Sequence, residues 1–393
     1  MKPLEGVTIV EFATMITASL AAMMAAEQGA RVIKIEPATG GDPMRVMGSQ
    51  KAGMSGLFAN CNRGKESLAL DLKSPEAQSL AQQIAAGADV VITNFRPGVM
   101  ERLGLGSEAL RALNPRLIFI AITGFGTEGP LAGAPAYDPV IQAHAGIANI
   151  QGGNHPALLK TLVCDKLTAY TACQALTAAL FQRERTGQGE HVDLSMLDSN
   201  LFFFFPDSFM NHTLLDEDIE HRPLLADVMA PTQTADGAIV LSAATYKQRQ
   251  GVHRAIGMEW IETDPRFSDT AAFQRNLGEY RALIAEGFEQ MKTDEVVAAL
   301  SENDVPCARC LSRDEVVADP QFAANNSMSE IVHPHLGRMR IARLPARFGG
   351  TQAPVSRPAP LHGEDSRALL AEQGLDSTAI DALIASGTVA EQV

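Results

Sequence analysis

The sequence predicts an α/β fold, in which a large Rossmann-like domain with a parallel sheet is accompanied by a smaller α+β domain. Three observations lead to this fold class. Short apolar segments typical of buried strands alternate with helical segments through the first third of the chain. After about residue 225 this alternation gives way to a mixed pattern of helices and short strands. The chain of 393 residues, with 46% hydrophobic composition, is also long enough to form two cores.

The expected strands of the large domain are short runs rich in Val, Ile and Leu, bounded by Gly, Pro or Asp. Strands separated by helices pair mostly in parallel, because the helix carries the chain back to the start of the next strand. The five runs are VTIVEFA (7–13), RVIKIEP (31–37), SLALDL (67–72), DVVITNF (89–95) and LIFIAITGF (117–125).

Local signals mark three helices between and after these strands. The Ala- and Met-rich segment 18–29 ends in glycine, a common helix stop. Ser74 precedes Pro75, as an N-cap precedes a proline at the first helical position, so a helix should run from there to about Gly87. Residues 163–184 form a second long helical region with many small side chains.

The remaining chain suggests three successive parts: the large domain at 1–224, the small domain at 225–330, and a segment at 331–393 that returns to the large domain. In the small domain a turn and strand are expected at 236–244, and helices near 247–256 and 277–301. Segment 330–360 is rich in Pro, Gly and Arg without periodicity and is expected to be extended crossing chain. The last two predicted helices are RALLAEQGL (367–375) and STAIDALIASG (377–387).

Composition excludes several classes of protein. A formal net charge of -14 repels phosphate backbones, so nucleic acid is not an expected partner. No signal peptide and no apolar run of about 18 residues is seen, so no membrane span is expected. Five scattered cysteines fit a reducing cytoplasm better than a disulfide framework.

Metal and nucleotide motifs are also missing from the sequence. Neither the glycine-rich dinucleotide motif nor the P-loop motif is present. Cys307 and Cys310 form a single C-x-x-C without a second ligand pair, and His333 and His335 flank a proline that suggests a surface loop. No metal site and no permanently bound cofactor are therefore expected.

Asp165 is unusual because it lies in the otherwise apolar helical stretch LVCDKLTAYTACQAL. One interpretation is that Asp165 caps this helix, since aspartate is a good N-cap and a poor helix-interior residue. The other is a functional carboxylate near a helix N-terminus, where the dipole helps keep it ionised and nucleophilic. The two interpretations are compatible.

Sequence blocks along nearly the whole chain resemble the class III (CaiB/BaiF-type) CoA-transferases. They occur in the order and spacing of that family, which makes them specific as a set. The blocks are PLEGVTIVEF, EQGARVIKIEPATGGDPMR, NRGKESLALDLKSPEA, TNFRPGVMERLGLGSEALRALNPRLIFIAITGFGTEGP, AYDPVIQAHAGI, CDKLTAYTACQALTAALFQRERTGQGEHVDLSMLD and VPCARCLSRDEVVADPQF.

This resemblance implies a two-domain chain that forms an interlocked-ring homodimer, in which two chains thread through one another. It also implies that acyl-CoA and a small carboxylic acid are the substrates, with Asp165 as the nucleophile. In the family, that aspartate attacks the donor thioester to form a mixed anhydride, and then becomes an aspartyl-CoA thioester. An incoming carboxylate reverses the sequence.

The resemblance further implies a set of residues that contact CoA or face the catalytic carboxylate. Lys73 and Arg102 are suited to phosphate. Two departures concern Ile16, near the place where some transferases have glutamine, and Pro37, where several relatives have arginine. The implied set consists of Leu70, Lys73, Asn94, Phe95, Arg102, Tyr137 and Asp138.

Two alternatives remain open. Racemases of α-methylacyl-CoA share the fold and need a histidine just before the aspartate of the AYD-like block. Tyr137 occupies that place here, and a phenol with an ordinary pKa near 10 is a poor base at neutral pH. A non-catalytic acyl-CoA binder would keep Lys73 and Arg102 but tolerate loss of Asp165.

Overall fold

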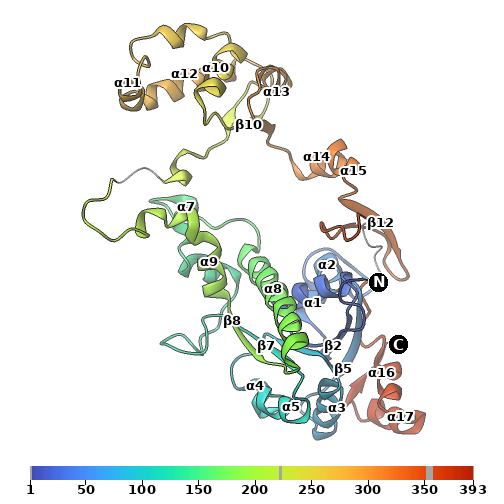
Figure 1. Cartoon of the computed structure of the whole chain (residues 1–393). Coiled ribbons are helices and arrows are strands. Elements are labelled where there is room, and N and C mark those ends of the chain that lie inside the picture. Colours follow the sequence, from blue (N-terminus) through green and yellow to red (C-terminus); the bar gives the residue numbers. More distant parts are fainter. Residues whose placement is uncertain (1, 221–223, 351–356, 393) are drawn as a thin grey trace. The chain divides into compact units, whose positions relative to one another are not determined.

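The computed structural model describes residues 2–220, 224–350 and 357–392, and the chain forms two compact units (Figure 1). The larger unit comprises Met1–Ile219 and Asn326–Val393, and the smaller unit comprises Glu220–Asn325. Each has its own hydrophobic core. Among the described residues, no helix combines the length and the apolar character needed to cross a bilayer.

A seven-stranded, largely parallel sheet organises the larger unit, which confirms the predicted α/β class. The strand order is β14-β5-β2-β1-β6-β7-β8, and only β14 is antiparallel to its neighbour. The chain therefore starts in the middle of the sheet and reverses its direction of growth between β1 and β6, as in Rossmann folds. The strands are β1 (Thr8–Phe12), β2 (Arg31–Pro37), β5 (Lys65–Leu70), β6 (Val90–Thr93), β7 (Ile118–Thr123), β8 (His191–Ser195) and β14 (Val389–Ala390).

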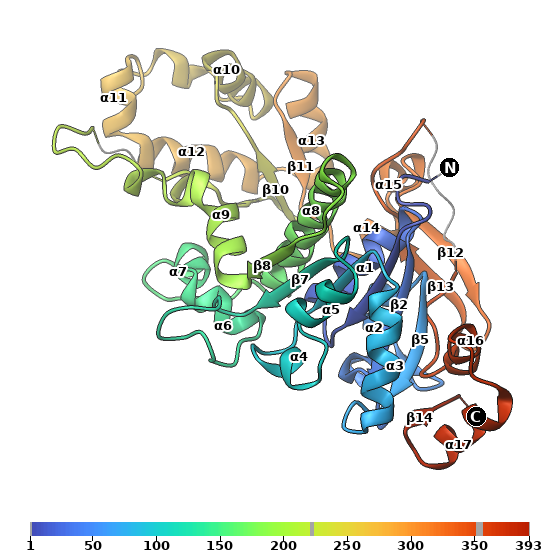
Figure 2. The ribbon, with the colours of Figure 1, turned by 60° about the horizontal axis from the view of Figure 1, so that its bottom comes forward.

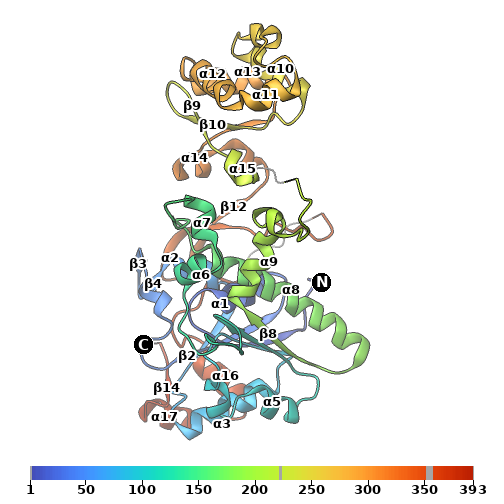
Figure 3. The ribbon, with the colours of Figure 1, turned by 90° about the vertical axis from the view of Figure 1, so that its left-hand side faces the viewer.

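Helices cover both faces of this sheet. Successive strand residues point to opposite faces, so Ile9 and Val32 belong to one core cluster while Val10 and Ile33 belong to the other. The first cluster includes side chains of α1 and α8, and the second includes side chains of α3, α16 and α17. Figure 3 shows the ribbons of these helices around the sheet. These helices are α1 (Thr17–Glu27), α3 (Pro75–Ala86), α8 (Val163–Thr186), α16 (Ser366–Glu372) and α17 (Ser377–Ala385).

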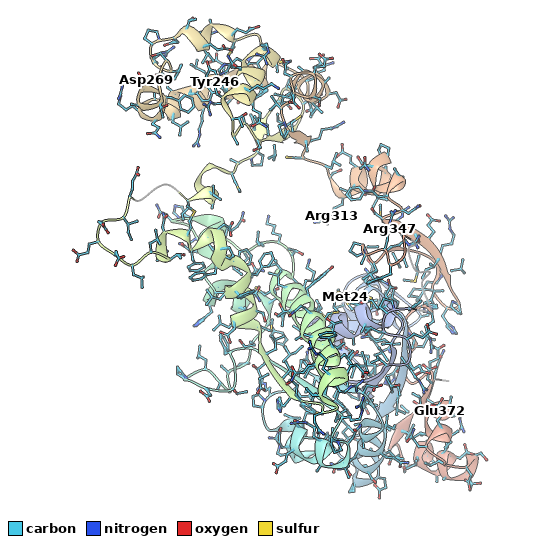
Figure 4. The ribbon with its side chains drawn as sticks, in the orientation of Figure 1. Met24, Tyr246, Asp269, Arg313, Arg347 and Glu372 are labelled. Atoms are coloured by element: carbon cyan, nitrogen blue, oxygen red, sulfur yellow. The ribbon has the colours of Figure 1, made fainter. Side chains whose placement is uncertain are left out.

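Local signals in the sequence fix several helix ends as predicted. The Ser74 side chain accepts a hydrogen bond from the backbone N–H of Ala77, with Pro75 at the first helical position of α3. Helix α8 extends to Thr186, two residues beyond the expected end at residue 184, and its C-cap Gly187 has a φ of 75°, in the left-handed region that glycine adopts without strain. At the C-terminal end of the chain, Glu372 of α16, labelled in Figure 4, pairs with Arg31 of β2 at 2.7 Å. Together with the β14–β5 pairing, this contact fastens the last helices to the sheet.

The smaller unit is a three-stranded antiparallel sheet with helices (Figure 2). Ile239, Val252, Phe288 and Leu300 form the centre of its core. Its elements are η3 (Leu225–Val228), β9 (Thr232–Gln233), β10 (Ala238–Leu241), α10 (Tyr246–Ala255), η4 (Glu259–Thr263), α11 (Thr270–Arg275), α12 (Leu277–Glu289), α13 (Thr293–Glu302), β11 (Cys307–Arg309), α14 (Arg313–Ala318) and α15 (Pro320–Ala324).

Two sequence-based expectations need correction. Residues 277–301 form the two helices α12 and α13 rather than one, because the Glu295 side chain accepts the N–H of Lys292 and begins a new helix there. The expected extended segment 330–360 contains most of a hairpin of β12 (Met328–His333) and β13 (Gly337–Ala342). Within it, residues 351–356 lie outside the described part of the chain.

His333 also differs from the surface loop expected around it. Its side chain is buried, and its Nε2 lies 2.9 Å from the carbonyl oxygen of Ala359. Its Nδ1 accepts the backbone N–H groups of His335 and Leu336, which organises the hairpin turn. The ring is therefore a structural part of this turn.

The edge strand β8 and the helix α9 that follows it were not expected from the sequence. The remaining elements of the larger unit are η1 (Pro43–Val46), β3 (Gln50–Lys51), β4 (Met54–Ser55), α2 (Gly56–Asn62), α4 (Val99–Arg102), α5 (Ser107–Leu113), α6 (Asp138–His144), α7 (Ile147–Gly152), α9 (Met196–Ser208) and η2 (Met210–His212).

Candidate active site

A cavity of about 260 Å³ lies at the carboxyl ends of four neighbouring strands of the larger unit. Its walls come from the segments that follow β1, β6, β7 and β8, together with the start of α8. Because the strand order reverses between β1 and β6, this is where open α/β sheets bind ligands. The lining residues are Thr14, Met15, Thr17, Asn94, Phe95, Arg96, Pro97, Ile122, Thr123, Gly124, Ala132, Ala134, Pro135, Ala136, Tyr137, Asp165 and Met196.

Asp165 is the carboxylate that lines this cavity. Helix α8 begins at Val163 with Leu162 as its N-cap, so Asp165 is the third helical residue. The interpretation of Asp165 as the helix cap is therefore wrong, because Leu162 occupies the cap position. Only 9% of the residue is exposed. The first turn of α8 thus presents a nearly buried carboxylate to the cavity.

The surroundings of Asp165 disfavour its ionised form. Burial raises the pKa of Asp165 to about 7, the negative charge of Asp138 acts in the same direction, and Lys166 lowers it. Desolvation is the largest of these effects, and it outweighs the charge of Lys166. Close to neutral pH, the carboxyl group of Asp165 exchanges readily between its acidic and ionised forms.

Asp138 is the buried partner of Asp165. It is the first residue of α6, and 1% of it is exposed. Its Oδ2 accepts the backbone N–H of Asp165 at 3.1 Å, and its Oδ1 accepts Nε2 of Gln142 at 2.6 Å. Both oxygens are therefore occupied by protein donors. Asp138 holds the first turn of α8 in place and is absent from the cavity lining.

Cys164 is the thiol next to Asp165 in the sequence, but it is a poor competitor as a nucleophile. The residue is completely buried, and its side chain is part of the core cluster beneath the sheet. Burial, with the charges of Asp138 and Asp165, raises the pKa of Cys164 to about 12. Because the thiolate is the reactive form of cysteine, this thiol is inert near neutral pH.

Asn94 lines the cavity, but its side-chain amide forms hydrogen bonds within the protein. Its Oδ1 accepts the N–H of Thr14 at 3.2 Å, and its Nδ2 donates to the carbonyl oxygen of Thr14 and to Oγ1 of Thr17. The side chain thereby ties the end of β6 to the turn between β1 and α1. Tyr137 and Phe95 also line the cavity, and Tyr137 is 64% exposed.

The other residues implied by the family resemblance lie outside the cavity lining. Leu70 is fully buried in the core, so a contact with CoA would have to come from its backbone. Lys73 and Arg102 are exposed. Within the described part of the chain, neither side chain forms an ion pair or hydrogen bond, and the same holds for the exposed Arg96. Lys73, Arg96 and Arg102, in the segments that follow β5 and β6, are thus available to bind an anion.

Other lining residues were not identified from the sequence. Ile16, near the place where some transferases have glutamine, is buried in a core cluster, and its neighbour Met15 lines the cavity instead. Gly124 directly follows β7 and also lines the cavity. Met196 follows β8, which was not predicted. No group of three or more metal-ligating side chains is found in the described residues.

The chain is similar in sequence and in structure to known CoA-transferases and CaiB/BaiF proteins. A model of the family described as CoA-transferase family III matches residues 4–366. The chain is 32% identical over 380 residues to the succinyl-CoA–D-citramalate CoA-transferase of Chloroflexus aurantiacus, covering 94% of each chain. It is 31% identical to the acetyl-CoA:oxalate CoA-transferase of Acetobacter aceti, covering 94% of this chain and 95% of that protein. A CAIB/BAIF family protein from Brucella suis superposes with a TM-score of 0.83 at 28% identity, covering 94% of this chain and 99% of the other.

Proposed function

Because this chain belongs to CoA-transferase family III, we propose that it moves CoA from an acyl-CoA donor to a small carboxylic acid, with Asp165 as the covalent carrier. The observation that carries this proposal is the nearly buried carboxylate of Asp165 in the cavity at the strand-order reversal, with a pKa raised to about 7. A desolvated carboxylate is less stabilised by water and is therefore a stronger nucleophile once ionised.

The proposed reaction has two exchange steps before the acceptor arrives. An oxygen of ionised Asp165 bonds to the thioester carbonyl carbon, the C–S bond breaks, and CoA leaves as a thiolate. The thiolate then attacks the side-chain carbonyl carbon of Asp165 in the resulting mixed anhydride, and the donor acid leaves as a carboxylate. Asp165 now carries CoA as a thioester, and the acceptor carboxylate reverses both steps. Neither water nor a proton is consumed.

Asp138 and Gln142 act as positioning residues in this scheme. Asp138 holds the backbone of Asp165, and Gln142 in turn accepts the N–H of Leu159 at 2.9 Å. These contacts fix the helix turn that bears the nucleophile. Small errors in the placement of a reacting group reduce rates strongly, by about a hundredfold for ~1 Å.

For CoA itself, we propose that Lys73, Arg96 and Arg102 bind the phosphates. Their side chains have no acidic partners among the described residues, whereas many other arginines of this chain are in ion pairs. An acidic chain with a formal net charge of -14 needs such a local concentration of cations to attract an anionic substrate. Arg96 lines the cavity, while Lys73 and Arg102 would bind parts of CoA outside it.

The acid is proposed to be a small mono- or dicarboxylate. A cavity of about 260 Å³ suits a short acyl group. The similar proteins are named for citramalate, glutarate and oxalate, with succinyl-CoA or acetyl-CoA as donors. The direct test is to supply succinyl-CoA and acetyl-CoA to the protein with a panel of such acids and to detect new acyl-CoA species by mass spectrometry. Absence of transfer in every combination would refute this choice of substrates.

We also propose that the two compact units are the domains of an interlocked homodimer. The larger unit carries the candidate site, and the chain leaves it after Ile219 and returns at Asn326. A cluster of exposed aromatic side chains supports a covering partner, since large exposed apolar patches mark interfaces. It consists of Phe202, Phe203 and Phe205 on α9, which are 84%, 57% and 40% exposed.

A racemase reaction has less support from the geometry. It needs a base near the α-carbon besides the carboxylate, and the residue before Asp138 is the exposed Tyr137. A binder without catalytic activity would not need the buried, destabilised carboxylate of Asp165.

A further inference from the structure

The turn between β1 and α1 contains a residue in an unusual backbone conformation. Met15 has a φ of 63°, in the left-handed region that side chains other than glycine, asparagine and aspartate rarely adopt. Together with Thr14 and Thr17, Met15 lines the cavity that contains Asp165. A wall of the candidate site therefore depends on a strained residue, which persists only when the surroundings hold it there.

Asp42 supplies one of these restraints. This residue is completely buried, and its Oδ1 accepts the backbone N–H of Met15 at 3.2 Å and that of Met44 at 2.9 Å. Its Oδ2 lies 3.0 Å from Nζ of Lys34. Oδ1 thus accepts two backbone N–H groups, whereas Oδ2 has no hydrogen-bond partner among the described residues and is paired with the ammonium of Lys34 by charge. An amide at this position would lose that charge and would place its own donor against either the backbone N–H groups or the ammonium.

Lys34 restrains the same turn from the sheet. Its Nζ donates to the carbonyl oxygen of Ala13 at 2.9 Å and to Oε1 of Glu11 at 2.7 Å. The other oxygen of Glu11 accepts Nζ of Lys65 at 2.6 Å. Side chains of Glu11, Lys34 and Lys65 are wholly buried. None of these charged groups lines the cavity, and their contacts connect to it through the turn.

We propose that Asp42, backed by Lys34, is a positioning residue that holds the strained backbone of Met15 and so fixes the wall of the acyl site. This inference rests on the proposed function, because it takes the cavity to be the place where the acyl group reacts with Asp165. Asp42 acts on the reaction through Met15, and it does not contact the substrate.

Asp42→Asn and a matched control test this role in the full-length protein. Glu27→Gln breaks another buried ion pair, that of Glu27 with Arg63 at 2.8 Å, near the far end of α1. We expect Asp42→Asn to lower kcat per folded molecule by about tenfold or more, with the KM for acyl-CoA changed by less than about threefold. Glu27→Gln should leave both constants close to those of the unaltered protein.

A double-mutant cycle separates a restraint on Met15 from a general structural role. Glycine adopts a positive φ without strain, so in a Met15→Gly protein the turn needs less support. Asp42→Asn should therefore reduce kcat less in that background than in the unaltered one. Equal losses in both backgrounds would overturn the proposal.

Hydrogen exchange provides a readout that does not depend on activity. Asp42→Asn should speed exchange at the amides of Thr14 and Met15, while Glu27→Gln should not. If Asp42→Asn does not fold, Asp42→Glu keeps the charge, displaces the carboxylate by one methylene and should have the same effect on exchange. Unchanged exchange in the folded variant would overturn the proposal. If the unaltered protein transfers no CoA, the proposed function fails, but exchange still decides whether Asp42 restrains the turn.

Discussion

The backbone N–H of Asp165 donates a hydrogen bond to Oδ2 of Asp138 across 3.1 Å. The same carboxylate thus orients the helix turn of Asp165 and, by its negative charge, helps to raise the pKa of Asp165. Burial makes the larger contribution to that rise. Asp138 therefore affects both the position of Asp165 and its pKa, and substitutions at Asp138 and near Asp165 can test these effects.

The pH dependence of transfer should report the ionisation of Asp165. Because the nucleophile must be ionised, kcat/KM is expected to rise with pH through a midpoint near 7. Asp138→Asn removes the like charge and should move this midpoint to lower pH. Lys166→Ala removes the charge that lowers the pKa of Asp165 and should move the midpoint to higher pH. Identical midpoints in the three proteins would exclude Asp165 as the titrating group.

Asp165→Asn should stabilise the protein at alkaline pH. The pKa of Asp165 is higher in the folded state than its ordinary value of 3.8, so the folded state binds the extra proton between these values. The contribution of Asp165 to stability is thus largest below about pH 4 and declines as the pH rises through 7. At pH 8 we expect the variant to be more stable by on the order of 1–3 kcal/mol, with a smaller difference at pH 5.

Thermal unfolding of the two proteins across this pH range measures the effect. Asp216→Asn, at an exposed position, serves as the control and should follow the unaltered protein at every pH. The compared quantity is the unfolding free energy of Asp165→Asn minus that of the unaltered protein. A smaller value of this difference at pH 8 than at pH 5 would contradict the argument from burial.

Gly124→Ala should damage the site by steric displacement. A Cβ atom on Gly124 would lie 2.3 Å from Cβ of Ala136, which also lines the cavity. The segment that carries Tyr137 would have to move, and we expect kcat/KM to fall by about tenfold or more. Gly133→Ala is the matched control in the same connection between β7 and α6, because a Cβ there meets no atom within 4 Å. Equal activities of the two variants would show that the contact between Gly124 and Ala136 does not shape the acyl site.

The interlocked dimer predicts that dilution releases no folded monomer. A ring threaded through its copy separates only after unfolding, whatever the strength of the contacts. Mass photometry at nanomolar concentration should therefore show dimers alone. A folded monomer under these conditions would contradict the interlocked arrangement.

Much of the larger unit could be predicted because its signals are local. The runs that became β1 and β2 are apolar, and the cap formed by Ser74 is visible in three consecutive residues. The strand β8 was harder to identify, because HVDLS is short and only partly buried at the edge of the sheet. In the hairpin of β12 and β13, the regular pattern was hidden by the Pro, Gly and Arg residues around it.

The candidate site could be predicted only in part. Asp165 was identified from its place in an apolar helix and from the family resemblance. Its raised pKa depends on Asp138, 27 residues earlier in the chain, and on burial by the whole unit, neither of which local sequence reveals. The role proposed for Met15 depends on its positive φ angle and on the hydrogen bond from its N–H to Asp42, which the sequence does not reveal. The neighbouring Ile16 was therefore singled out from the sequence instead.

The most direct test is to incubate the protein with an acyl-CoA donor and no acceptor, and then to locate CoA on the chain by mass spectrometry. We expect release of the free acid and a thioester at Asp165, which hydroxylamine converts to a hydroxamate on the peptide containing LVCDK. Asp165→Asn should abolish the adduct while the protein stays folded, and Cys164→Ala should retain it because that thiol is buried and protonated. A label on Cys164, or near-full transfer by Asp165→Asn, would contradict the proposed mechanism.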